Sequence, residues 1–251
     1  MRKQVHRWFS PHLGQEMPIA VYGHYGKPLL MFPTAAADFE EYERFLVIDV
    51  LRPYLDAGIV KIYSINSINR ESWMNDRLHP AQRAARQMAY SNYVSHEVCP
   101  FIRSDCGGSP VKIAATGASF GAYHAANSVF RNPGSFDTLI AMSGSYDIRP
   151  WCDGFHNDDV YFNNPIEYLQ HLNDDYFLPL LRYQSDIHIV SGQGAYEAPE
   201  RSRDLSRVLY SRGIPHSLDL WGHDVNHDWP WWRRMLDLYV PRLFHAYGPR
   251  S

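Results

Sequence analysis

A serine flanked by glycines is the residue in this sequence best suited to chemistry. Gly117-Ala118-Ser119-Phe120-Gly121 follows a short apolar run and precedes a helical stretch that stops near Pro133. A nucleophile on a strand-to-helix turn holds a strained backbone, and glycines two residues away on either side avoid clashes. We therefore expect Ser119 to project from a sheet, with the Phe120 amide beside it to bind an oxyanion. The alternative is that the glycines and Ser119 form a turn with a structural role only, which packs the helix on the strand.

A serine hydroxyl needs a basic partner, and the chain offers two histidines in the right place. A base must take the hydroxyl proton, and a carboxylate must orient that base. In enzymes whose nucleophilic serine lies on such a strand-to-helix turn, the three residues follow one another along the chain in the order serine, acid, histidine. His223 and His227 both lie between the last predicted strand and the closing helix. We favour His227, because it comes just before that helix and leaves His223 to shape the loop.

The acid should follow a strand that lies between the serine and the histidine in the chain. Glu197 lies in the polar loop after the predicted strand 187–190, and it precedes the next predicted helix. Asp147 follows the preceding strand and is the alternative acid. We favour Glu197 and keep Asp147 open.

A second oxyanion donor is expected in the loop after the apolar run 27–32. Pro33 has no amide hydrogen, so the amide must come from Thr34, Ala35 or Ala36. Their small side chains let the backbone approach a substrate closely. We favour Ala35, although a tight turn without any role explains each residue about as well.

Apolar runs and helical stretches alternate along the chain. An opening antiparallel pair precedes six strands separated by helices, which predicts a mainly parallel, eight-stranded sheet. With the serine turn after the fifth strand, this is the layout of an α/β-hydrolase, formed by one domain over residues 1–251. Residues 148–186 are polar and aromatic with weak periodicity, and predict a small cap-like excursion after the sixth strand. The predicted strands are 5–9, 17–22, 27–32, 59–65, one that begins at 111 and leads into the serine turn, 137–142, 187–190 and 216–221. The predicted helices are 39–57, 80–102, 120–130, 200–212 and 229–245.

The amino-acid composition of the chain bears on which partners and cofactors it is expected to bind. The 251 residues are 45% hydrophobic and 20% charged with a net charge of -3, which is typical of a globular protein and gives no reason to expect nucleic acid. The three cysteines lack metal-ligand spacing, so we predict neither a zinc site nor any other metal or cofactor. No signal peptide or membrane-spanning stretch is visible, and the default location is cytoplasmic. The aromatic content of 14% leaves a homo-oligomer open.

Four segments of the chain resemble the putative-esterase family of α/β-hydrolases. They are Gly-Ala-Ser-Phe-Gly-Ala-Tyr, Phe-Pro-Thr-Ala-Ala-Ala-Asp, Glu71-Ser72-Trp73, and Gly-Ile-Pro-His…Leu-Asp-Leu-Trp-Gly…His-Asp-Trp-Pro-Trp-Trp. That family is similar to S-formylglutathione hydrolases, feruloyl esterases and mycolyltransferases. The resemblance covers nearly the whole chain and is most specific in its last segment.

The resemblance implies a set of site residues. It places the nucleophile on Ser119, the base on His227, and the oxyanion amides on Phe120 and Ala35. The chain departs from the pattern in one respect, because many relatives carry Asp in the loop where this chain has Glu197.

The function expected from these residues is hydrolysis of a small carboxylic ester through an acyl-enzyme. Trp73 and Thr34 are the expected substrate contacts. One alternative is acyl transfer to an acceptor other than water, which a dry aromatic surface around Trp73 and Tyr161-Phe162 would favour. The other is a non-catalytic α/β-hydrolase scaffold that binds a ligand or partner.

Overall fold

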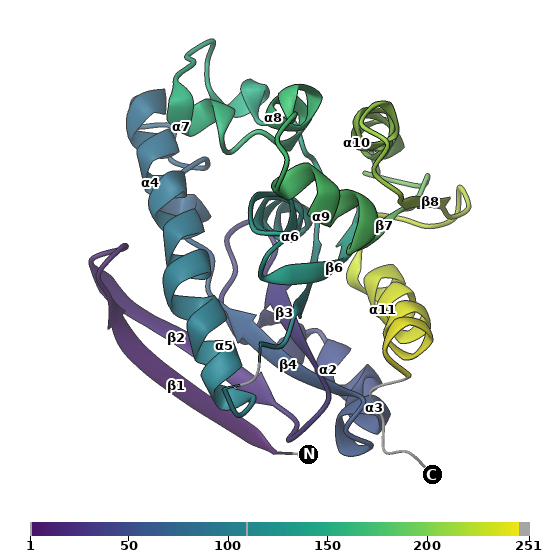
Figure 1. Ribbon diagram of the computed structural model, residues 1–251. Helices are drawn as coiled ribbons and strands as arrows, with labels where there is room; N and C mark the ends of the chain where they lie inside the picture. Colours follow the sequence, from purple (N-terminus) through teal and green to yellow (C-terminus); the bar gives the residue numbers. More distant parts are fainter. Residues whose placement is uncertain (1, 109, 246–251) are drawn as a thin grey trace.

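The computed structural model describes residues 2–108 and 110–245, and its framework is one eight-stranded sheet (Figure 1). The strand order is β1-β2-β4-β3-β5-β6-β7-β8. β1 pairs antiparallel with β2, and β2 antiparallel with β4, whereas every later pairing is parallel. The strands are β1 (Lys3–Ser10), β2 (Gln15–Tyr22), β3 (Lys27–Phe32), β4 (Val60–Ile65), β5 (Ile113–Ala118), β6 (Phe136–Met142), β7 (Asp186–Ser191) and β8 (Ser217–Leu220). This arrangement confirms the predicted α/β-hydrolase fold.

Helices cover both faces of the sheet, and alternate strand residues belong to different faces. Leu30 and Phe32 of β3 pack with one group of helices, while Leu29 and Met31 pack with the other. The first group is α4 (Pro80–Tyr93), α5 (Cys99–Asp105), α6 (Phe120–Arg131), α8 (Pro165–His171), α9 (Phe177–Tyr183) and α10 (Pro199–Ser211). The second group is α1 (Glu41–Arg44), α2 (Val47–Val50), α3 (Arg52–Asp56) and α11 (Trp229–Phe244). Figure 1 shows α4 and α11 on opposite sides of the strands.

Two predicted helices are interrupted in the structure. The predicted helix 39–57 is wrong as a single element and forms α1, α2 and α3 instead. Leu46 has φ 61°, a left-handed conformation that ends one helical turn and begins another. The predicted helix 80–102 contains a π-helical segment, η2 (Val94–Val98), just before Pro100. Proline cannot donate to the carbonyl one turn earlier, and the wider turn accommodates this loss.

The segment 148–186 contains four short helices. They are η3 (Arg149–Trp151), α7 (Asp158–Tyr161), α8 and α9, and α7 and α8 are at the top of Figure 1. Ile148, Cys152 and Val160 pack in a small cluster with Trp73 and Tyr123. The first half of the excursion therefore rests directly on α6, the helix that follows Ser119. Its role as a cap remains a prediction. Within the described part of the chain, no helix combines the length and apolarity required to cross a membrane.

The two motif glycines allow strands β3 and β5 to approach helix α6 closely. A Cβ atom on Gly117 would lie 2.2 Å from the carbonyl carbon of Gly121. A Cβ on Gly121 would lie 2.3 Å from the carbonyl oxygen of Phe32, at the end of β3. This confirms that both positions need glycine for lack of space. The contact also brings the loop after β3 against the first turn of α6.

We expect Gly121→Ala to destabilise the protein, although alanine is the better helix former. Alanine in a helix gains about 1 kcal/mol over glycine, but overpacking against fixed backbone costs about 1–3 kcal/mol. Urea unfolding should therefore show a net loss for Gly121→Ala. Gly134→Ala is the control, because its Cβ would meet only the Tyr176 hydroxyl, at 3.4 Å. Equal stability of the two variants would contradict this reading of the close contact.

Candidate active site

Ser119 occupies the turn between β5 and α6 in a strained conformation. Its backbone has φ 55° and ψ -120°, values that L-residues other than glycine rarely adopt. The amide of Ser119 donates to the carbonyl of Met142 in β6 over 2.9 Å, which fixes the turn to the sheet. The side chain is partly exposed at the carboxyl end of β5. The strain is thus held in place by the packing of two strands and a helix.

Glu197 and His227 come together on the loops after β7 and β8. Oε2 of Glu197 lies 3.4 Å from Nδ1 of His227. The Glu197 side chain is 0% exposed, while that of His227 is 25% exposed, so the pair joins a buried carboxylate to an accessible ring. With the Nδ1 proton directed at the carboxylate, Nε2 of the imidazole is left as the proton acceptor.

Two residues that the sequence analysis missed hold this pair. The Ser143 hydroxyl donates to Oε1 of Glu197 over 2.6 Å. Nε1 of Trp232 in turn donates to the Ser143 hydroxyl over 3.1 Å, and the Trp232 ring lies edge-on to His227 at 5.0 Å. Trp232 therefore supports the acid through Ser143 and the base directly. Only its place in the His-Asp-Trp-Pro-Trp-Trp segment could have suggested this role.

The carboxylate of Glu197 is ionised although it is buried. Burial pushes its pKa upward, but hydrogen bonds from His227 and Ser143 outweigh burial and hold the pKa below its usual value of 4.5. The Ser191 hydroxyl, 3.3 Å from Oε2, is a further donor. A negative charge is therefore present at neutral pH to favour a protonated imidazole.

Backbone hydrogen bonds connect the acid loop to the histidine loop. Gly194 donates to the carbonyl of Val225 over 2.8 Å, and the amide of Ala195 donates to the Asn226 side chain over 2.8 Å. The amide of His227 donates to the carbonyl of Ala195 over 3.0 Å. A Cβ on Gly194 would lie 2.7 Å from the carbonyl oxygen of Val225 and 2.8 Å from that of His223, so the close approach of the two loops favours glycine. These hydrogen bonds hold the two loops together.

The alternative acid has other partners, and the alternative base is exposed to solvent. Asp147 accepts hydrogen bonds from Arg149 over 2.9 Å and from Asn164 over 3.2 Å. His223 is exposed on the same loop as His227. The structure therefore brings Glu197, and not Asp147, to the favoured histidine.

Two backbone amides in the loop after β3 have no hydrogen-bond acceptor among the described residues. The amide and hydroxyl of Thr34 both donate to Glu41, over 2.7 and 2.6 Å, so neither is available to a substrate oxyanion. In contrast, the amides of Ala35 and Ala36 donate to no group among residues 2–108 and 110–245. Phe120 lies at the first turn of α6, which Gly121 packs against the end of β3. The favoured Ala35 and Phe120 thus flank one junction.

The chain matches the model of one protein family over residues 10–243, described as "Putative esterase". That match spans far more than half of the sequence. The chain belongs to this esterase family. Membership supports ester hydrolysis as the class of reaction. No curated protein gives a match.

Solved structures of esterases share the fold of this family member. A ferulic acid esterase superposes with a TM-score of 0.76 at 18% identity, covering 98% of this chain and 99% of its own. An S-formylglutathione hydrolase from Agrobacterium tumefaciens gives a TM-score of 0.73 at 14% identity, with 98% and 95% covered. MPT51 (FbpC1) from Mycobacterium tuberculosis gives 0.68 at 14% identity, with 98% and 99% covered. At these identities the likeness shows the shared fold alone.

Aromatic side chains of this esterase-family chain gather beside the serine. The Phe120 ring stacks on Trp151 at 4.4 Å and 13°. Trp73 lies behind them, 6.4 Å from Trp151, with only 4% of its surface exposed. Its indole nitrogen donates to the Tyr123 hydroxyl over 3.2 Å. Trp73 thus belongs to the buried cluster against which the partly exposed rings of Phe120 and Trp151 pack.

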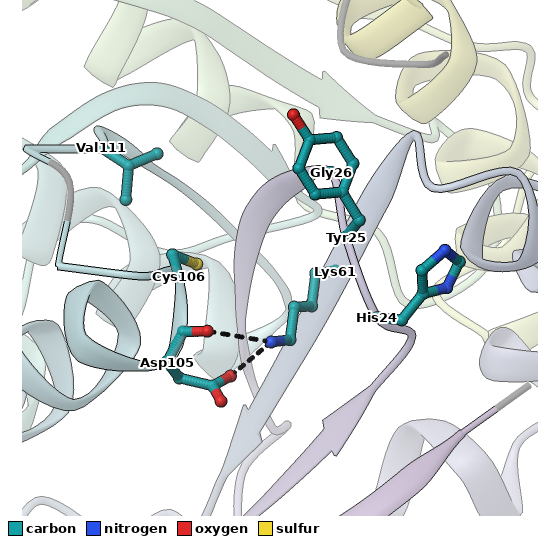
Figure 2. A pocket seen from close by; sticks show the side chains of 7 residues that line it. All are labelled: His24, Tyr25, Gly26, Lys61, Asp105, Cys106 and Val111. Carbon is teal, nitrogen blue, oxygen red and sulfur yellow. Dashed lines mark hydrogen bonds and ion pairs between the residues drawn. The ribbon is translucent and has the colours of Figure 1, made fainter.

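A cavity of about 350 Å³ lies at the other end of the strands (Figure 2). Its lining includes Lys61 near the start of β4, Gly26 just before β3 and Val111 just before β5. Figure 2 shows Lys61 hydrogen-bonded to Asp105 within it. Ser119 follows the opposite end of β5, about 20 Å away for a strand of this length. The cavity therefore takes no part in the candidate site.

Replacing Glu197 with Gln should remove a pH-dependent part of the stability. The pKa of Glu197 in the folded chain is below its usual 4.5. Wild type thus gains stability above that usual pKa and loses it as pH falls through the folded value. We expect the stability advantage of wild type over Glu197→Gln, measured by urea unfolding, to shrink from about pH 6 to about pH 3.

The control for this measurement is Glu200→Gln, because the Glu200 side chain is 71% exposed. Its stability difference from wild type should change far less over the same range. A pH-independent difference for Glu197→Gln would show that the carboxylate is not preferentially ionised in the folded state.

Proposed function

We propose that this chain is a serine hydrolase that cleaves carboxylic esters through an acyl-enzyme. Ser119 is the nucleophile, His227 the general base and Glu197 the acid that orients it. The observation that carries the proposal is the buried carboxylate of Glu197 at 3.4 Å from His227, on loops at the carboxyl end of the sheet where Ser119 also lies. Serine, acid and histidine occur in the chain order expected for this fold.

The residues divide the reaction into two steps. Oγ of Ser119 bonds to the ester carbonyl carbon while its proton passes to Nε2 of His227, and the same proton then leaves with the alcohol. Water then attacks the carbonyl carbon of the acyl-enzyme and loses a proton to His227. His227 passes this proton to Oγ of Ser119 as the acyl C–Oγ bond breaks and the carboxylic acid leaves. The charge of Glu197 stabilises the imidazolium that forms in both steps.

The developing oxyanion is bound by the amides of Phe120 and Ala35. Two observations support this assignment, since Phe120 opens helix α6 and the Ala35 amide has no acceptor within the described residues. The positive end of the α6 dipole adds to the field at the oxyanion. Thr34 orients the loop through Glu41, and Trp73 supports Phe120 and Trp151, which form the surface for the substrate.

Acyl transfer to an acceptor other than water has less support than hydrolysis. That alternative depended in part on Tyr161 and Phe162 drying the site. In the structure both line a cavity of about 480 Å³ next to Arg131, at the far end of α6 from Ser119. A helix of 12 residues spans about 18 Å, too far for these rings to exclude water from the nucleophile.

Ser119→Ala should abolish ester hydrolysis without unfolding the protein. With p-nitrophenyl acetate as substrate, we expect kcat/KM to fall by about 10⁴-fold or more, because the nucleophile and base act as a unit. Ser104→Ala, an exposed serine on α5, should keep wild-type kinetics. Full activity in the Ser119→Ala variant would contradict the proposed mechanism.

Exchanging the two carboxylates for amides should identify the acid. We expect Glu197→Gln to lower kcat by about 10²–10⁴-fold, because the imidazole loses its orientation and its counter-charge. Asp147→Asn should leave kcat within about twofold, since Asp147 is engaged by Arg149. The reverse order of effects in steady-state kinetics would assign the acid to Asp147.

A further inference from the structure

A chain of buried polar side chains lies beneath the oxyanion loop. Nδ2 of Asn69 donates a short hydrogen bond to the carbonyl of Ala35. Oδ1 of the same amide lies 2.7 Å from Nε2 of His124, and Nδ1 of His124 lies 3.5 Å from Nε2 of Gln87. Asn69, His124 and Gln87 are 0%, 2% and 1% exposed. Three separate elements, η1 (Asn69–Glu71), α6 and α4, thus converge on one loop carbonyl.

The direction of each hydrogen bond in this chain is determined by its neighbours. Because Nδ2 of Asn69 donates to Ala35, its Oδ1 must accept from His124. His124 therefore carries its proton on Nε2, and its Nδ1 accepts from Gln87. Burial lowers the pKa of His124 to about 3, so the ring is neutral and keeps this tautomer at neutral pH.

Aromatic rings surround the histidine. Phe32 and Phe120 lie 6.1 and 5.6 Å from the His124 ring, and Tyr90 and Tyr123 lie 5.0 and 4.9 Å from it. Hydrogen bonds in such surroundings meet little competition from water and hold their geometry well. Burying these polar side chains costs free energy, because Oε1 of Gln87 is buried without a hydrogen-bond partner among the described residues. Their presence therefore calls for a reason beyond filling the core.

Fixing the Ala35 carbonyl fixes the amides around it. A peptide unit is planar, so the carbonyl of Ala35 sets the direction of the Ala36 amide. The direction of this carbonyl relative to the Ala35 amide is given by ψ of Ala35. Holding the carbonyl therefore restricts the direction of the Ala35 amide as well. Ser67 reaches the carbonyls of Ala35 and Ala37 at 3.4 and 3.0 Å. Glu41 holds Thr34 from the other side.

We propose that Asn69 and His124 are positioning residues that aim the oxyanion loop at the nucleophile. This inference rests on the proposed function of the same site. His124 lies on α6, five residues after Ser119 and four after Phe120. The helix that follows the nucleophile and supplies one oxyanion amide therefore also holds the loop that supplies the other. The polar chain sets the separation between the two halves of the oxyanion hole.

A matched pair of substitutions tests this role. His124→Gln keeps an amide N–H near the position of Nε2, whereas the shorter His124→Asn lacks a donor there. Loss of an oxyanion donor costs about 10²–10³-fold in kcat, and misalignment should cost less. With p-nitrophenyl acetate we expect His124→Asn to lower kcat about 10–100-fold with KM within about twofold, and His124→Gln to recover most of the loss.

Asn69→Ala provides a second route if His124→Asn folds poorly. It removes the bond to the Ala35 carbonyl without touching the rings around His124. We expect a similar loss in kcat. Inhibition by an aryl trifluoromethyl ketone should weaken by the same factor as kcat, because its adduct with Ser119 carries the oxyanion that the loop binds. A purely structural role would lower thermal stability and leave both readouts unchanged.

The outcomes separate the two levels of the proposal. Wild-type kcat and inhibitor affinity in Asn69→Ala and His124→Asn, together with an inactive Ser119→Ala, would overturn the positioning role and leave the serine mechanism intact. Full activity of Ser119→Ala would overturn both. A loss of kcat in both variants with unchanged KM, restored by His124→Gln, supports the positioning role.

Discussion

The site depends on one buried charge, the carboxylate of Glu197. A carboxylate with no exposed side-chain surface stays ionised only where donors replace its lost hydration. Here Ser143, Ser191 and His227 supply those donors. The same bonds that keep the charge also fix the imidazole, so electrostatics and orientation have a common origin.

That charge in turn constrains the elements around it. Ser143 directly follows β6, Glu197 lies in the loop after β7 and His227 lies in the loop after β8, so three neighbouring strand ends must be in register. Trp232 in α11 closes the arrangement by donating to Ser143. On the other side of Ser119, Gly121 lets α6 contact the end of β3 and brings the loop after β3 close to the first turn of α6. Both halves of the site therefore depend on close packing at the carboxyl edge of the sheet.

The fold could be predicted from the sequence because the patterns that indicate it are local in the chain. Apolar runs, helical periodicity and the glycine-flanked serine each appear within about ten residues. The prediction of a single helix over 39–57 was wrong because no residue type in this part of the sequence indicates that Leu46 adopts a left-handed conformation. Glu197 and His227 could be proposed from chain order, and the structure brings them together. Ser143 and Asn69 escaped prediction because their partners lie 54 and 34 residues away in the chain.

The most direct test of the account is covalent labelling by a fluorophosphonate probe, mapped by mass spectrometry of the digested protein. We expect a single adduct, on the peptide that contains Ser119, which disappears when His227 is replaced with alanine. An unlabelled wild-type protein, or an adduct on any other residue, would contradict the claim that Ser119 is an activated nucleophile.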